Sequence, residues 1–591
     1  MKINKKFYKN NYFIIIIISL AIISPQIINH ASAFGVDSLF QYNRIYDAMR
    51  SWKTNTFSPI SLFGFDSVGR VANALYGPGL INLLGIFLLI SKSWFGFQAL
   101  TNFLMYSGSG IIMNFSARKI GISRKNSLLI ATLWMLGNQW TVNWQVNTSF
   151  SAWGSLLLPL LAISIKTLLG KRNNFITYIV WLAFPITLLV QVHVFSALIG
   201  ILILTPVVLY RLFFKPDIVF TISLMISIFL VLLLSGNFIG ASFEFFQNSL
   251  ISTVPVPLTT GTRLPTLTEN IGNIVVISAS TLILISLVFR FRNFKIDFSN
   301  YKSVYVIILV FFAFLSSPLF PWVIVSRFFP ETMSFIQFPF RFYVVFLLFG
   351  LLILGNELDN PSFVFVKELH VLTVITVVLY IFAGLSVSSN IVKTYYEPSF
   401  INTLNTNSQN GYGTIKNSEE ARNLFKVDSS KLIQTLHGGT PDYLPQSSHY
   451  KNQPDISIYH RGWTNVTDPY SLYTEALRER SKDVAKTISR NTIVVSWSQD
   501  NNHKKDLPLI IYKNSKIELN GKSLLVSKIQ TNDIGFISIK AAAGTNILKL
   551  SYNPGAFYTY AELVSRISWF SLLLLLFYSF LRKIARYSLA M

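Results

Sequence analysis

The stretch from residue 1 to Arg44 constrains this chain more than any other. A lysine-rich segment, residues 1–9, precedes an apolar run from Tyr12 to Ile28, after which the chain reads Gly35-Val36-Asp37. The apolar run approaches the roughly 20 residues that a helix needs to cross a bilayer. We therefore expect a membrane span that delivers an acidic side chain, Asp37, to the far membrane surface, with Arg44 seven residues later.

Composition extends this interpretation to the whole chain. Of the 591 residues, 51% are hydrophobic and only 13% are charged, whereas a soluble protein carries about 25% charged residues. We predict a polytopic α-helical membrane protein with about 12–14 spans, each of a length that crosses a bilayer. The further apolar runs lie at 76–92, 97–116, 126–142, 150–169, 174–191, 194–213, 218–238, 273–290, 303–320, 339–355, 371–387 and 563–581.

The net charge of +24 is concentrated in short loops between these runs. Loops that carry excess Lys and Arg face the cytoplasm, so we expect anionic membrane lipids as partners and no nucleic acid. The basic loops are Arg118-Lys119, Arg124-Lys125, Lys171-Arg172, the group Arg290, Arg292 and Lys295, and Arg582-Lys583. Loops 211–217, 290–302 and 356–370 are then inside, and segments 137–150, 239–272, 321–338 and 388–560 are outside.

Two points of topology stay open. Asp37 outside and Arg118 inside require an odd number of crossings, yet two apolar runs lie between them; either 76–92 is re-entrant or too short to span, or the charge rule fails locally. In addition, Ala31-Ser32-Ala33 resembles a signal cleavage site, so cleavage is an alternative to a retained first span.

The absence of cysteine excludes disulfides, thiolate metal sites and cysteine nucleophiles. The sequence has no phosphate-binding loop of the Walker type. We predict no metal site and no required cofactor, although a divalent cation remains possible.

A change of composition marks a separate domain. Residues 388–560 are polar and rich in Asn, Ser and Lys, and their second half alternates as β-strands do. Asn520-Gly521 is a hairpin signal. We predict a transmembrane domain (1–387) whose first external loop (34–75) is catalytic, an extracytoplasmic β-sandwich (388–560), and a last span with a basic cytoplasmic tail (561–591).

Four groups of residues are candidates for a site on the outer surface. Asp37 is either a solvated acid that caps the next helix or a general base. Arg44 is either an interfacial anchor or a phosphate ligand. Arg341 lies in a proline-broken stretch that enters a span, where a charge needs a partner; it is either an interfacial anchor or a phosphate ligand, and Gln337 is available for a sugar hydroxyl. His193 is either a hydrogen-bonded structural residue or part of the same site.

Other residues have weaker claims. Glu244, Arg263, Glu269 and Glu331 lie in the same external loops. Four tryptophans are most simply interfacial residues, with sugar stacking as the lesser alternative; they are Trp134, Trp140, Trp144 and Trp153.

These motifs together resemble one family. Asp37-Ser38-Leu39-Phe40-Gln41 with Arg44 resembles a D-x-x-F-H…R opening, and Ile336–Phe342 resembles a Q-F-P-W-R-F motif. Tyr76-Gly77-Pro78, His193 with Ser196, and Asp442-Tyr443-Leu444-Pro445 also fit. The chain resembles the YfhO-like bacterial membrane proteins, related to the 6-pyruvoyl-tetrahydropterin-synthase-related membrane proteins of the GT-C glycosyltransferase superfamily. Gln41 and Phe340 depart from the pattern, which casts doubt on proton transfer at Gln41.

The resemblance implies an enzyme of the cell membrane. It implies inverting transfer of a sugar from a polyprenyl-phosphate donor to an envelope glycopolymer or glycolipid acceptor on the outer face. Asp37 is then catalytic, and Gln41, Arg44, His193, Gln337 and Arg341 bind the donor's phosphate or sugar. The alternatives are a lipid or polysaccharide transporter or flippase and a non-catalytic envelope-assembly partner.

Overall fold

A computed structural model of the chain describes most of the sequence. The described residues are 10–170, 174–248, 250, 261–291, 296–329, 333, 335–362, 365–407, 412–413, 415–446 and 469–588. The predicted basic residues Lys171, Arg172, Arg292 and Lys295 lie outside this set, as do Glu331 and Ser334.

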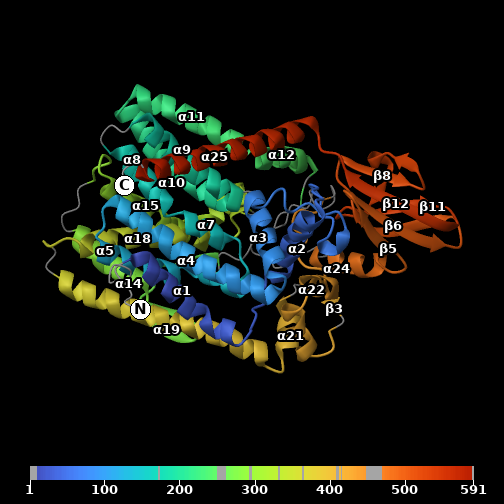
Figure 1. The fold of residues 1–591 in the computed structure, drawn as a ribbon, viewed down its shortest axis with the longest axis horizontal. Helices are drawn as coiled ribbons and strands as arrows, with labels where there is room; N and C mark the ends of the chain where they lie inside the picture. Colours follow the sequence, from blue (N-terminus) through green and yellow to red (C-terminus); the bar gives the residue numbers. More distant parts are fainter. Residues whose placement is uncertain are drawn as a thin grey trace.

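Most described residues belong to helices that pack side by side into an elongated body, with β-sheets at one end (Figure 1). The first half of the body contains α1 (Asn11–Ile28), α2 (Ser38–Thr54), α3 (Pro78–Ser91), α4 (Trp94–Ile120), α5 (Arg124–Gly137), α6 (Gln139–Asn147), α7 (Ser151–Leu157), α8 (Leu160–Leu169), α9 (Phe175–Val192) and α10 (Val194–Phe214). The second half contains α11 (Ile218–Leu234), α12 (Gly236–Phe245), α14 (Ala279–Phe291), α15 (Tyr301–Ser316), α16 (Trp322–Phe328), α18 (Tyr343–Leu358), α19 (Val366–Tyr396) and α25 (Ala556–Ser588).

Fewer helices could cross a membrane than the 12–14 predicted. Within the described residues seven helices are long and apolar enough, and the pair α11 and α12, bent by 63°, is an eighth candidate. The seven are Asn11–Ile28, Ser151–Leu169, Phe175–Val192, Val194–Phe214, Pro339–Leu358, Val366–Tyr396 and Ala556–Arg582.

The predicted and observed numbers of spans differ because several apolar runs contain helix breaks, which a hydropathy profile does not show. The run 126–142 is divided at Asn138, whose side chain accepts a hydrogen bond from the backbone N–H of Trp140 and so begins a new helix. The run 273–290 starts within a hairpin of β1 (Thr268–Ile271) and β2 (Ile274–Ile277). Helix α3 in the run 76–92 has only 14 residues, which favours the alternative that this segment is too short to span.

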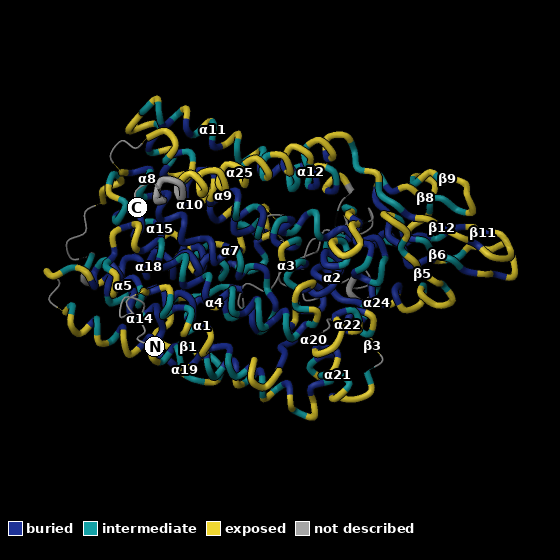
Figure 2. Tube along the Cα trace, viewed as in Figure 1, coloured by how far each residue is buried: buried dark blue, intermediate teal, exposed yellow. Residues whose placement is uncertain are grey.

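The helices differ in what surrounds them. Helix α18 is buried along its length, whereas α25 and α11 expose apolar side chains on the outside of the body (Figure 2). Exposed leucines on α25 include Leu573, Leu574 and Leu575. A contiguous exposed apolar surface of this kind marks contact with a membrane or another protein.

Several residues of the loops predicted to be cytoplasmic lie at one end of the body. At one end, Lys166 donates hydrogen bonds to the carbonyls of Lys119 and Ile120, and His370 lies 2.9 Å from Asn126. Arg290 pairs with Glu357 at 2.6 Å. The opposite end carries the two larger β-sheets (Figure 1). The loops predicted to be cytoplasmic therefore gather away from residues 388–560.

Residues 388–560 are helical before they become β-structure. Helix α19 continues past the predicted boundary to Tyr396. It is followed by α20 (Phe400–Asn407), β3 (Tyr412–Gly413), α21 (Ser418–Lys426), α22 (Ser429–Thr435), β4 (Leu436–His437) and α24 (Pro469–Arg480). We call residues 400–555 the C-terminal domain below.

Two antiparallel sheets complete this domain. One has the strand order β5-β6-β12-β8-β9 and the other β10-β11-β7. Their buried side chains share one core, as the predicted sandwich requires. The strands are β5 (Ala485–Ser489), β6 (Thr492–Gln499), β7 (His503–Ile510), β8 (Ser515–Leu519), β9 (Lys522–Leu524), β10 (Gln530–Thr531), β11 (Phe536–Ala541) and β12 (Gly544–Tyr552). Asn520 and Gly521 form the predicted turn, both with positive φ.

The loop after α2 belongs to the same core. Val68, Val71 and Leu75 are buried among the sheet residues, and the Ile510 N–H donates to the Val68 carbonyl at 2.8 Å. The predicted external loop 34–75 is therefore divided: α2 packs on the helical body, and residues 60–75 pack on the C-terminal domain. This connection brings the two parts together around α2.

Candidate functional site

The chain places Asp37 at the start of α2 without using its side chain to cap the helix. Asp37 occupies the N-cap position, yet no side-chain hydrogen bond caps α2. The preceding segment is fixed, because Ala33 exchanges hydrogen bonds with Gln98 of α4 at 2.9 and 2.7 Å. Gly35 packs so closely on Asn147 that a Cβ atom would lie 2.2 Å from its Oδ1. The carboxylate is therefore held in place and is free of the capping role.

Three neighbours set the ionisation of Asp37. Burial raises the pKa of its carboxyl to about 6, while Arg341 lowers it, Asp442 raises it and the hydroxyl of Ser149 lowers it by hydrogen bonding. The residue still retains part of its solvent exposure. A carboxyl with this pKa is mostly ionised at neutral pH and is a stronger base than an ordinary aspartate.

Arg44, one of the predicted phosphate ligands, is fully buried within the protein. Its guanidinium donates to Gln41 Oε1 at 2.8 Å, to Asn73 Oδ1 at 3.2 Å and to the carbonyl of Tyr76. It also lies 4.5 Å from the ring centroid of Tyr76. The interfacial-anchor interpretation is therefore wrong, and Arg44 is a buried cation whose guanidinium is hydrogen bonded to Gln41, Asn73 and the Tyr76 carbonyl.

Arg341 is held by its own motif. Its Nη1 donates to the Ile336 carbonyl at 3.1 Å and its Nη2 donates to Gln337 Oε1 at 2.8 Å. Gln337 adopts a left-handed φ of 58°, a conformation that few non-glycine residues accept. The turn thus uses Gln337 to orient Arg341, which remains partly exposed.

His193 has the structural role that was its simpler interpretation. It sits between α9 and α10, and its Nδ1 lies 2.8 Å from Ser196 Oγ and accepts the Ser196 N–H at 3.3 Å, which caps α10. Its ring lies 5.7 Å from that of Tyr76. His193 therefore shapes one wall of the site.

Tyr76 connects these groups. Besides Arg44 and His193, its ring approaches Tyr443 of the C-terminal domain at 6.4 Å. Phe195 links His193 to Arg341, whose guanidinium lies 5.4 Å from the Phe195 ring. The structure thus brings Asp37, Arg44, His193 and Arg341 into one site.

Asp442 completes the site and was not among the predicted site residues. Burial raises the pKa of its carboxyl, Arg70 lowers it, and the Asp442 charge in turn acts on Asp37. Arg70 also donates a hydrogen bond to the Asp442 carbonyl. The run Asp442-Tyr443-Leu444-Pro445 was noticed only as part of a family pattern, and no spacing in the sequence shows that it meets Asp37.

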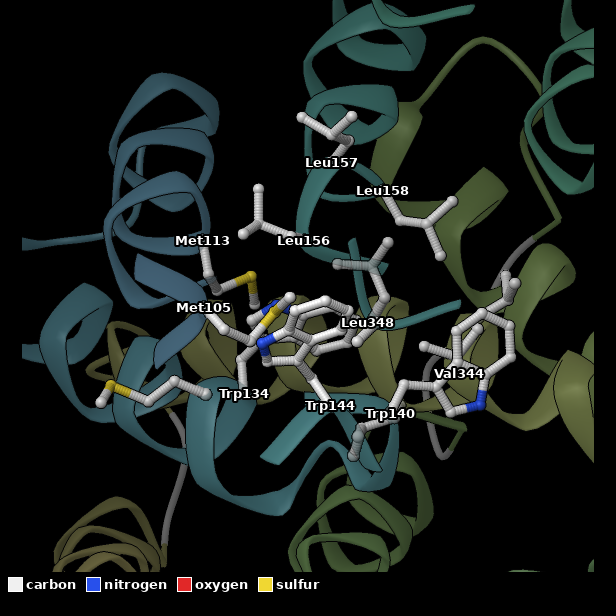
Figure 3. Packing of buried hydrophobic residues seen from close by; sticks show 14 of the residues in the cluster. Met105, Met113, Trp134, Trp140, Trp144, Leu156, Leu157, Leu158, Val344 and Leu348 are labelled. Carbon is white, nitrogen blue, oxygen red and sulfur yellow. The ribbon is translucent and has the colours of Figure 1, made fainter. Parts of the chain in front are cut away.

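Three of the four tryptophans are buried, contrary to the interfacial interpretation. Trp134, Trp140 and Trp144 pack among Met105, Met113 and leucines inside the helical body (Figure 3). Trp153 is partly buried and lies edge-on to Trp144 at 5.4 Å. Of the four, Trp140 lies beside the site, with its ring 6.4 Å from that of His193.

The remaining candidates make structural contacts. Glu244 accepts hydrogen bonds from Tyr552 Oη at 2.8 Å and from the Gly555 N–H at 3.1 Å. Arg263 pairs with Glu269 at 2.9 Å. This pair lines a cavity of about 610 Å³ that begins at residues 32–35, just before Asp37. Its wall carries the uncharged amides of Asn143, Asn147, Asn270 and Asn390.

No model of a known protein family matches this chain, and no curated protein matches it either. Among the residues that the structure describes, no group of three or more His, Asp or Glu side chains could hold a metal ion.

Proposed function

We propose that this chain is an integral membrane glycosyltransferase of the GT-C type that moves a sugar from a polyprenyl-phosphate donor to an envelope glycopolymer or glycolipid. The observation that carries the proposal is that Arg341, from a distant segment, lies near enough to Asp37 to lower the pKa of its carboxyl. One partly exposed carboxylate, freed from helix capping, lies within electrostatic range of a partly exposed arginine from a distant segment. A base beside a cation suits a reaction that deprotonates an alcohol and releases a phosphate.

In this mechanism Asp37 accepts the proton of an acceptor hydroxyl. The hydroxyl oxygen forms a bond to the anomeric carbon as the bond from that carbon to the phosphate oxygen breaks. Polyprenyl phosphate leaves with the bonding electrons, and the configuration inverts. A general base of this kind accelerates such a step by about 10²–10⁴-fold.

The cations stabilise the leaving group. Arg341 is the direct phosphate ligand, because its guanidinium is partly exposed while Gln337 holds its orientation. The guanidinium of Arg44 donates its hydrogen bonds within the protein, so Arg44 adds positive electrostatic potential to the site without contacting the phosphate. Preorganised charge where negative charge develops is commonly the largest part of catalysis. The amide-lined cavity before Asp37 offers hydrogen bonds for the donor's sugar.

The membrane setting fits the donor. Seven long apolar helices and the exposed apolar face of α25 suit a multi-pass protein, and the site lies toward the end that carries the C-terminal domain. We propose that this end is extracytoplasmic, because the basic loops gather at the other end. The lipid tail of the donor then stays in the bilayer while its phosphate reaches Arg341.

The test compares envelope polymers from cells that have the parent gene, no gene or the Asp37→Asn variant. The proposal predicts a sugar substituent that is present with the parent and lost from the other two at equal protein levels. If the variant restores the substituent as fully as the parent does, the transporter or assembly-partner alternative takes its place.

A further inference from the structure

A second cavity lies apart from the site around Asp37. It has a volume of about 730 Å³ and opens between α2, the loop after α2 and the C-terminal domain. Arg50 of α2, His437 of β4, Lys486 of β5 and Arg490 after β5 contribute to its wall. None of its described lining residues belongs to the Asp37 site.

The charge of this wall is positive. Asp66 is the one acidic residue among the described lining residues, and its carboxylate lies 2.5 Å from His437 Nδ1. Lys486 donates from Nζ to two neutral carbonyls, those of Asp66 at 2.7 Å and Pro508 at 3.1 Å. Asp66 also acts on Lys486, and Asp428, outside the cavity wall, interacts with Arg50. The three cations Arg50, Lys486 and Arg490 therefore still outnumber the two acids that act on this group.

Arg50 is also incompletely hydrogen bonded. Its Nη1 donates to Tyr46 Oη at 3.2 Å, and its guanidinium lies 4.9 Å from the Phe63 ring centroid. Its Nε is buried and has no acceptor among the described residues. A buried donor without an acceptor is unfavourable, so the described residues leave the hydrogen bonding of the Arg50 guanidinium incomplete.

One wall of the cavity is strained. Phe65, Asp66 and Ser67 have consecutive left-handed φ values of 52°, 57° and 53°, a conformation that costs free energy in every residue except glycine. The Asp47 carboxylate maintains it by accepting the backbone N–H groups of residues 62, 63 and 64. Strain of this kind gathers at ligand sites, and here it accompanies the contact between Asp66 and His437.

We propose that this cavity binds an anionic glycan, a sugar that carries a phosphate or a carboxylate group. The volume falls within the range of about 300–1,000 Å³ that ligand sites occupy, which is far more than a bare anion fills. The wall adds the hydroxyls of Thr54 and Thr56, the amide of Gln434 and the ring of Tyr46, which are groups that bind sugars. The inference concerns binding alone and does not rest on the proposed transfer.

The experiment titrates the full chain in detergent by calorimetry with four probes: glucose 6-phosphate, glucuronate, glucose and inorganic phosphate. The proposal predicts saturable binding of at least one of the two charged sugars, and weaker binding of glucose and of inorganic phosphate. If glucose binds as tightly as both charged sugars, the anionic requirement is wrong. If inorganic phosphate binds as tightly as glucose 6-phosphate, and glucuronate no more tightly than phosphate, the site takes simple anions and the glycan assignment is wrong.

Variants locate the binding. Arg50→Gln and Arg490→Gln should each weaken charged-sugar binding, Arg50→Gln by about 10- to 100-fold because a hydrogen bond to a charged group is lost. Arg50→Lys should recover part of it. Lys522→Gln, which removes one positive charge from the exposed β8–β9 turn, should leave it unchanged. Arg490 is exposed, so its variant serves even where Arg50→Gln lowers the melting temperature. Unchanged affinity in both arginine variants overturns the proposal, as does an equal loss in Lys522→Gln.

Discussion

Asp442 of the C-terminal domain lies close enough to Asp37 for its charge to raise the pKa of the Asp37 carboxyl. The two aspartates are separated by most of the chain, and they meet because residues 60–75 pack on the domain that carries Asp442. The domain therefore contributes to the ionisation of the proposed base.

This relationship predicts a shift in the pH dependence of transfer. With the pKa of Asp37 raised to about 6, kcat/KM should rise as pH increases through about 6, because only the ionised carboxylate is a base. Asp442→Asn removes the neighbouring negative charge, so the rise should move to lower pH. Asp500→Asn is the matched control, since Asp500 is an exposed turn residue of the same domain. A profile that Asp442→Asn leaves in place would show that Asp37 is not the titrating base.

Arg341 provides a test of phosphate binding. Arg341→Ala should raise the donor KM or lower kcat/KM by about 10- to 100-fold, since a charge-assisted hydrogen bond contributes about 1.5–3 kcal/mol. Arg341→Lys should recover only part, because lysine lacks the planar fork. Gln337→Ala should have a smaller effect in the same direction, because Gln337 orients Arg341 at 2.8 Å. Steady-state kinetics at varied donor concentration measure these effects. If all three variants have the kcat/KM of the parent protein, Arg341 does not belong to the site.

The absence of cysteine allows a direct test of orientation. Lys522→Cys places one thiol on the exposed β8–β9 turn, and Lys125→Cys places one at the basic end. A membrane-impermeant maleimide should label the first variant in intact protoplasts and the second only after lysis. The reverse pattern would invert the proposed orientation.

Local chemistry predicted part of this fold well. The alternation after residue 492 marked most strands, and Asn520-Gly521 marked a hairpin because both residues accept positive φ. The positions of the basic loops in the sequence predicted that these loops group together, and in the structure Lys166, Asn126 and Arg290 lie at the same end of the helical body. The number of spans was overestimated because hydropathy measures apolar content and not helix length. Asn138 and the turn at Gly272 interrupt two apolar runs, so neither run forms one long helix.

The site could be predicted only for residues that stand next to a recognisable sequence feature. Asp37, Arg44 and Arg341 follow apolar runs or prolines, so their positions near one surface could be inferred. Asp442 lies in a polar domain, and only the packing of residues 60–75 on that domain brings it to Asp37.

Asp66 illustrates the opposite error. It lies in the same predicted loop as Asp37, and its neighbours form no recognised motif, so sequence alone predicts that Asp66→Asn costs much less activity than Asp37→Asn. The structure instead pairs it with His437 at 2.5 Å in a strained turn. Asp66→Asn should therefore disturb the contact between α2 and the C-terminal domain, and it is unsuitable as a control.

The most direct test of the mechanism is the rate of sugar transfer by purified Asp37→Asn protein with a polyprenyl-phosphate-linked donor. The substitution keeps the size of the side chain and removes the base, and because Asp37 makes no helix-capping hydrogen bond the fold should persist. We expect transfer to fall by about 10²–10⁴-fold with donor binding retained, while Asp500→Asn transfers at the parent rate. Transfer by Asp37→Asn at the parent rate would contradict the account.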